Sequence, residues 1–376
     1  MTVTRLLGVT ALALVLAACS EPAEPAPEHG YVAGAEELSE PRSAIAYAAD
    51  GGRTLRLLDL ATTEDVGIGL RIAARELSED GRFLYLTDGD RTLEIVDAGV
   101  WTVDHTDHVH YYRAPAKSIG TLTLETPITS VAGDGGHTAI GTAGGTVVVL
   151  DRRALESGEI REVSRFGDTA SAVPYEDLLL AARDGQIVTV DAAGRRVGAM
   201  QAPCATPAGW VVLRGGALLA CDTHFVRVKR AAPGFEAEVV PAPGLRPLSP
   251  AGFGFRPRSN EAAVADDGGI WSLNAPKATA RHLPMAGVRA AASPADGNTV
   301  LSLGENGTLR SHDLASGKEL AAAKTAATRL TLDVNRAYLT EPATGVIREI
   351  DYRDGLRTAR TFPAAVRPDL AVEVGR

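Results

Sequence analysis

The chain has 376 residues, of which 45% are hydrophobic and 23% charged, and its formal net charge is −9. This acidic balance, with scattered arginines and no basic stripe, excludes a surface built to neutralise nucleic-acid phosphates. A chain of this size buries a large core, either in two domains or in one repetitive domain.

The first nineteen residues read as an export signal. Arg5 supplies a short positive region, and Leu6 to Leu16 form an apolar run that is too short to span a bilayer. The run ends in Leu-Ala-Ala-Cys, so residues 1–19 resemble a bacterial lipoprotein signal whose Cys19 becomes the lipidated N-terminus. An ordinary secretory peptide with an incidental cysteine is the alternative. Either reading places the mature protein outside the cytoplasm, and the first adds a lipid anchor to the membrane.

Residues 20–42 are expected to be a flexible tether. The stretch up to Gly30 is rich in proline and glutamate and lacks large apolar side chains, so it cannot bury a core. Glu36 to Arg42 reads as a turn. Residues 43–376 are therefore assigned to the folded domain.

A repeat between residues 44 and 351 sets the fold. Each copy has a short apolar strand, a turn of Gly, Asp or Asn and a second alternating strand, often ending in Asp. The copies recur about every 40 residues, which is typical of the four-stranded blade of a β-propeller. The sequence predicts an all-β, single propeller of eight blades, with seven as the alternative. The first copy lacks an innermost strand, and Asp369 to Val374 is expected to complete it and close the ring.

One interval, from Asp97 to Asp151, is 54 residues long and contains an insertion of about sixteen residues, near 103–118. This insertion holds His105, His108 and His110 with Asp104 and Asp107. Neutral imidazoles suit Zn²⁺, a carboxylate can complete a tetrahedral shell, and an extended His-x-His places both rings on one side. The segment therefore predicts a zinc site on a loop, and a polar surface loop is the plain alternative.

Other residues are assigned with less support from the pattern. His137 follows a turn expected on the same face and is a further candidate ligand, or else an exposed residue at the start of a strand. Tyr111, Tyr112 and Arg113 are expected to pack the insertion against the ring, and the alternative is that a Tyr hydroxyl or Arg113 orients a metal ligand. His224 is expected in a turn on the opposite face, as a surface histidine, with a ligand of a second site as the alternative. The other histidines are expected to be isolated; they are His29, His282 and His312.

Cys204 and Cys221 are the only cysteines besides Cys19. In an oxidising compartment they are a candidate disulfide, which would close a loop of about 18 residues and contribute about 3 kcal/mol to stability. Two reduced, buried cysteines are the alternative.

The signal, the repeat, the run from Asp104 to Arg113, the cysteine pair and the terminal Glu-Val-Gly together resemble the AztD-type zinc metallochaperones. The resemblance implies an extracytoplasmic, monomeric propeller that transfers Zn²⁺ to the solute-binding protein of a zinc ABC transporter. It implies that His105, His108 and His110, with Asp104 or Asp107, bind the metal. The chain departs from the family pattern at three places. His29 stands alone ahead of the first blade, and Thr129 and Ser130, and also Ala208, stand where relatives have histidine.

Two other functions compete with a zinc carrier. A three-histidine site with an open position could activate water, as in zinc hydrolases. The chain has no GxSxG or HExxH motif and no carboxylate clearly placed as a general base, so an enzyme is not expected. A lipid-anchored propeller that acts as a protein scaffold without metal is the other alternative.

Overall fold

The computed structural model describes residues 32–105, 108–169, 171–205 and 207–376. The proposed lipidation site at Cys19, the signal segment, most of the tether, His29 and Asp107 lie outside this part of the chain.

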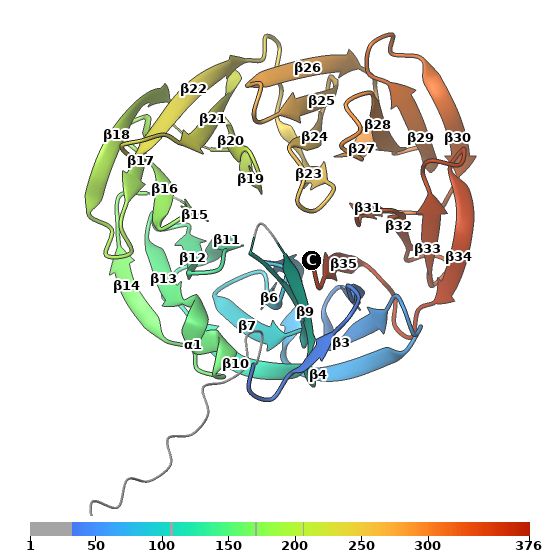
Figure 1. The fold of residues 1–376 in the computed structure, drawn as a ribbon, viewed down its shortest axis with the longest axis horizontal. Helices are drawn as coiled ribbons and strands as arrows, with labels where there is room; N and C mark the ends of the chain where they lie inside the picture. Colours follow the sequence, from blue (N-terminus) through green and yellow to red (C-terminus); the bar gives the residue numbers. More distant parts are fainter. Residues whose placement is uncertain (1–31, 106–107, 170, 206) are drawn as a thin grey trace, which may run out of the picture.

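The described residues form a nearly all-β ring of radially arranged sheets, which confirms the β-propeller fold (Figure 1). The sheet containing the chain's first long strands has the order β35 (Leu370–Val374), β2 (Ala44–Ala48), β3 (Gly52–Asp59), β4 (Asp65–Ala74). The next has the order β5 (Glu76–Glu79), β6 (Phe83–Thr87), β7 (Thr92–Asp97), β10 (Lys117–Thr123).

Three further four-stranded sheets follow in chain order. They are β11 (Ile128–Gly133), β12 (His137–Thr142), β13 (Val147–Asp151) and β14 (Glu162–Phe166); β15 (Ala172–Tyr175), β16 (Leu178–Arg183), β17 (Gln186–Val190) and β18 (Arg196–Pro203); and β19 (Gly209–Leu213), β20 (Gly216–Ala220), β21 (His224–Arg230) and β22 (Phe235–Pro241). A short helix, α1 (Arg152–Glu156), links β13 to β14. No helix among the described residues is both long and apolar enough to span a membrane.

The last part of the ring contains an eight-stranded sheet and a four-stranded one. The former consists of β23 (Leu248–Phe255), β24 (Glu261–Asp266), β25 (Gly269–Asn274), β26 (Thr279–Pro284), β27 (Val288–Ser293), β28 (Thr299–Gly304), β29 (Thr308–Asp313) and β30 (Glu319–Lys324); the latter of β31 (Arg329–Leu332), β32 (Ala337–Glu341), β33 (Val346–Asp351) and β34 (Arg357–Pro363). Parallel pairing of β23 with β27 joins two antiparallel meanders into the eight-stranded sheet. Whether that sheet is one blade or two separates seven blades from eight, so the count of eight stays a prediction.

The C-terminal strand closes the ring, as the sequence predicted. β35 pairs with β2 along five register positions, from Ala44 opposite Val374 to Ala48 opposite Leu370. This pairing covers the inner edge of β2, which would otherwise be an open template for another strand.

Each sheet packs against a neighbour on both faces, so inner strands such as β2 and β6 are buried along their whole length. One core cluster contains Tyr85 and Ile95 from one sheet and Ile140 and Val148 from the next. The recurring Asp has a local cause, since its carboxylate accepts backbone N–H groups of the turn that follows. Asp59, for example, accepts hydrogen bonds from the amides of residues 61 and 62. This is the Asx-turn geometry that favours Asp at strand ends.

Two expectations about the region around the insertion were wrong. Glu36–Leu38 does not form a turn: it is strand β1, and it lies within the proposed tether. The insertion is a hairpin rather than a loop, made of β8 (Val100–Asp104) and β9 (Val109–Arg113). β1 adds to the edge of β9, which gives a three-stranded sheet. The backbone groups of β1 find their hydrogen-bond partners in β9, which is distant in the sequence, so the sequence of β1 alone does not predict a strand.

Candidate metal centre

The hairpin positions one of the three clustered histidines through its regular pairing. Side chains of β9 alternate between the two faces, so His110 and Tyr112 share one face, and His108 directly precedes the strand. His110 is opposite Val103 of β8 in the register. His105 directly follows β8, and its N–H donates to the carbonyl oxygen of His108 over 2.9 Å. This hydrogen bond holds the third histidine across the hairpin from the other two.

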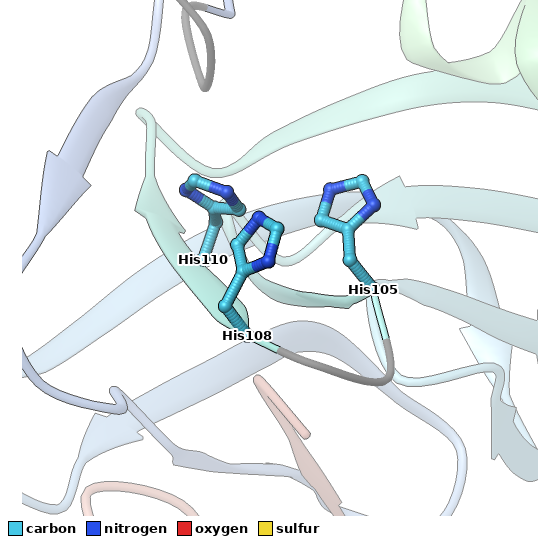
Figure 2. Close-up of side chains that lie close together, drawn as sticks. All are labelled: His105, His108 and His110. Carbon is cyan, nitrogen blue, oxygen red and sulfur yellow. The ribbon is translucent and has the colours of Figure 1, made fainter.

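The three imidazole rings gather at one point, as Figure 2 shows. The ring centroid of His105 lies 5.0 Å from that of His108 and 5.3 Å from that of His110, and the centroids of His108 and His110 are 4.9 Å apart. One nitrogen from each residue lies within 4.8 Å of the other two. His105 and His108 are exposed and His110 is half-buried, so the cluster faces solvent from a partly buried base.

A carboxylate from β1 contacts the half-buried member of the cluster. Oε1 of Glu37 lies 2.6 Å from Nδ1 of His110, and the His110 side chain is 11% exposed. Glu37 pairs with Tyr112 in the register, and the ring of Tyr112 stacks on that of His110 with centroids 6.1 Å apart. Burial raises the pKa of Tyr112, and the charge of Glu37 adds to that effect.

Aromatic packing holds the base of the hairpin on the ring. Trp101 and Tyr112 are opposite each other in the register, and their rings stack with centroids 5.2 Å apart. The guanidinium of Arg82 lies over the Trp101 ring, with Cζ 3.7 Å from the ring centroid. The same guanidinium forms an ion pair with buried Asp97 at 2.8 Å. The expected packing role is therefore found for Tyr112. Arg113 instead forms an exposed ion pair with Glu36 of β1.

In the view of Figure 1 the hairpin overlies the inner part of the ring. The hydroxyl of Thr102 donates to the carbonyl oxygen of Gly375, next to the closing strand. Asp104 Oδ2 lies 3.7 Å from Nη2 of Arg214, which belongs to the turn between β19 and β20. The hairpin thus contacts segments far apart in the chain, on different sheets of the ring.

The cavity within the ring is separate from the histidine cluster. A cavity of about 1060 Å³ is lined by the inner strands, including residues such as Leu77, Phe255 and Arg329. His105, His108 and His110 are absent from its lining. The candidate metal centre is therefore a surface site at the end of the hairpin.

Other residues proposed as ligands are not grouped with the three histidines. Asp104 is placed beside Arg214, outside the cluster of described residues. His137 is the first residue of β12, where its N–H donates to Asp134, and it is also outside that cluster. Asp107 lies outside the described residues. Zinc ligation by these three residues stays a prediction.

The remaining described histidines lie apart from the cluster, and each packs against or is buried by residues of the propeller. His224 begins β21 rather than lying in a turn, and its Nε2 is 2.7 Å from the carbonyl oxygen of Pro203. His282 stacks on Trp271 with centroids 4.6 Å apart. His312 is buried, and burial lowers its pKa.

Cys204 and Cys221 form a disulfide, with Cα atoms 5.4 Å apart. This excludes the alternative of two reduced cysteines. The bond joins the residue after β18 to the residue after β20, so it links two neighbouring sheets of the ring.

Comparison with known proteins identifies the fold but not a sequence family. No family model matches the chain, and no curated protein matches it. Among solved structures, apo AztD from Citrobacter koseri matches with a TM-score of 0.73, at 16% identity, over 89% of this chain and 99% of that one. The chain shares the fold of AztD.

Two further solved structures support the same architecture. A second crystal structure of Citrobacter koseri AztD matches with a TM-score of 0.70, at 16% identity, over 89% of this chain and 98% of that one. The computationally designed Ika8 protein matches with a TM-score of 0.51, at 15% identity, over 87% of this chain and 98% of that one. The AztD-type fold expected from the sequence is therefore confirmed.

Sequence reasoning missed two charged residues next to the site. Glu37 lies 73 positions from His110 along the chain, in a three-residue strand with no periodic signal. Arg214 belongs to a turn on a distant sheet. The only available hint for Glu37 was the Glu-Glu-Leu run directly before the first blade.

Proposed function

We propose that this protein binds Zn²⁺ as cargo at His105, His108 and His110 and delivers it to a partner protein outside the cytoplasm. The observation that carries the proposal is the convergence of three imidazoles, with nitrogens within 4.8 Å of one another, at the end of one hairpin. Neutral imidazole is a common zinc ligand, and three protein ligands are the usual set where a fourth position is kept for exchange.

The distances fit a site that closes slightly on the metal. Two nitrogens bound to one tetrahedral Zn²⁺, each about 2.0–2.1 Å from it, are about 3.3 Å apart. The nitrogens of the cluster, which lie within 4.8 Å of one another, therefore need to approach by up to about 1.5 Å. His105 and His108 are exposed, so their side chains can make this movement by rotating, without displacing buried neighbours.

Exposure of the site favours transfer over permanent retention. A structural zinc site is closed by four protein ligands, whereas a surface site with three admits an incoming ligand before the metal leaves. Protonation removes the coordinating lone pair of an imidazole, so acidification should promote release.

The partner and the location follow from the family resemblance. The proposed acceptor is the solute-binding protein of a zinc ABC transporter, and the carrier is proposed to be a monomer anchored through lipidated Cys19. The AztD fold and the disulfide support this assignment, since disulfides persist in oxidising compartments such as the periplasm.

Binding and transfer are favoured over catalysis. A zinc hydrolase needs a general base beside the metal-bound water. The cluster found among the described residues consists of imidazoles alone. Glu37 is hydrogen-bonded to Nδ1 of one imidazole, which is not the position of a general base beside a metal-bound water.

Zinc titration of the mature domain against a chelating indicator tests the proposal. We expect one tightly bound Zn²⁺, lost in the His105→Ala/His108→Ala/His110→Ala variant. His224→Ala, which removes an imidazole from β21, is the matched control and should bind as the unchanged protein does. His137→Ala measures whether that residue adds a ligand. If the triple variant retains the zinc, or the unchanged protein binds none, the proposal is wrong and a metal-free scaffold is the better account.

A further inference from the structure

Glu37 is the charged residue that the pairing of β1 brings to the histidine cluster. In the register Glu37 is opposite Tyr112, so both side chains lie on the same face of the three-stranded sheet. His110 is two residues before Tyr112 and shares that face, which makes it the diagonal neighbour of Glu37. The contact of 2.6 Å between Oε1 and Nδ1 follows from this register.

We infer that Glu37 is a positioning residue for His110, an inference that rests on the proposed zinc site. Its carboxylate accepts a hydrogen bond from Nδ1–H, so Nε2 is the nitrogen that carries the free lone pair and is therefore the coordinating atom. The same hydrogen bond fixes the orientation of the ring and increases its basicity, as carboxylates do for metal-binding histidines in general.

The distance distinguishes this role from that of a fourth ligand. Two ligand atoms on one tetrahedral Zn²⁺ are about 3.3 Å apart, whereas a charge-assisted hydrogen bond is about 2.7–2.9 Å or shorter. The value of 2.6 Å belongs to the second class. Glu37 is also outside the group whose ligand atoms lie within 4.8 Å of one another.

This role links the docking of β1 to zinc binding. β1 is a three-residue edge strand with two exposed residues, and its ion pair between Glu36 and Arg113 is exposed at both ends. Such an exposed pair contributes little to stability, so β1 is held chiefly by its backbone pairing with β9. If docked β1 raises the affinity for zinc, bound zinc must stabilise docked β1 by the same factor. Displacing β1 would then favour release of the metal.

Zinc affinity of strand variants provides the first test. Glu37→Ala should weaken zinc binding by about 10- to 100-fold, the usual effect of removing such a partner. Glu37→Gln keeps a hydrogen-bond acceptor and should recover part of the loss. Glu36→Ala is the matched control, because it removes the neighbouring acid and its ion pair but leaves Glu37 in place. Equal affinities for Glu37→Ala and Glu36→Ala would overturn the inference.

Nitrogen-15 NMR of His110 in zinc-free protein provides the second test and does not depend on metal binding. The expected tautomer has its proton on Nδ1, and Glu37→Ala should shift the population toward the Nε2 proton. An unchanged tautomer in Glu37→Ala would overturn the inference even if zinc binds. A protein that shows the expected tautomer but binds no zinc would instead refute the proposed function and leave the contact itself established.

Discussion

Cζ of Arg82 lies 3.7 Å from the centroid of the Trp101 indole, so a side chain of the propeller packs directly on the base of the histidine hairpin. Arg82 is itself fixed by the buried carboxylate of Asp97. Trp101 also stacks on Tyr112, which in turn lies against His110. A chain of packed side chains therefore connects the rigid blade to the half-buried histidine.

Trp101→Ala should loosen the hairpin and weaken zinc binding together. The side chain is 8% exposed, and truncation of a buried Trp to Ala costs up to about 3–5 kcal/mol. We expect hydrogen-exchange protection to fall in β8 and β9 more than in the blades, and zinc affinity to fall with it. Trp101→Phe keeps an aromatic ring and serves as the control. Unchanged protection of the hairpin in Trp101→Ala would show that the stack does not anchor it.

The disulfide should stabilise the ring without influencing the metal centre. Cys204 and Cys221 are 17 residues apart in sequence, and closing a loop of this size contributes about 3 kcal/mol. The Cys204→Ala/Cys221→Ala variant should therefore unfold at a lower denaturant concentration and bind zinc as before. Urea unfolding and zinc titration of the same preparation measure both effects. A loss of zinc affinity in the folded variant would mean that the two regions are coupled.

Glu373 should make the protein less stable as the pH rises. Burial, assisted by the nearby charge of Asp333, raises the pKa of Glu373 to about 8, while its ordinary value is 4.5. The folded protein therefore holds the proton more tightly than the unfolded chain. The contribution of Glu373 to the free energy of unfolding is complete below about pH 4.5 and is lost as the pH rises through 8. Over that range the free energy of unfolding falls by at most about 1.4 kcal/mol per pH unit.

Glu373→Gln should remove this dependence, because the amide does not ionise. Unfolding measured from pH 5 to pH 9 should show the variant to be more stable than the unchanged protein at the alkaline end. If the two curves stay parallel throughout, Glu373 is not protonated in the folded state and the account of its burial in β35 is wrong.

Glu341 should act in the opposite direction and contribute to acid unfolding. Burial opposes its ionisation, but hydrogen bonds from Arg348, Thr325 and Thr344 outweigh that effect and lower its pKa to about 2. Its contribution is present above its unfolded value of 4.5 and is lost as the pH falls toward 2. Glu341→Gln should cost on the order of 3 kcal/mol at neutral pH and flatten the acid limb of the curve. Glu319→Gln, at an exposed acid paired with Arg310, is the control and should have little effect.

The sequence predicted the ring because its signals are local and repeated. The repeated strand pairs, the Asp at strand ends such as Asp59, and the strand at 370–374 that has no unit of its own each correspond to an observed feature of the ring. The proximity of His108 and His110 was predictable as well, because an extended His-x-His segment places both rings on one side.

The contacts around the site were not predictable, because they depend on pairings between distant segments. Glu37 reaches His110 only because β1 pairs with β9, and three residues are too few to show an alternating pattern. Arg214 meets Asp104 only because the ring brings the turn between β19 and β20 next to the hairpin. The sequence of the insertion predicts a loop because its histidines and carboxylates interrupt the apolar alternation of a strand, although Trp101 and Tyr112 are paired across a hairpin.

Zinc K-edge X-ray absorption of the stoichiometric zinc complex tests the central claim most directly. The account predicts three imidazole nitrogens at about 2.0–2.1 Å, and loss of this imidazole signal in the His105→Ala/His108→Ala/His110→Ala variant. A zinc spectrum without imidazole scattering, or one that the triple substitution leaves unchanged, would contradict it.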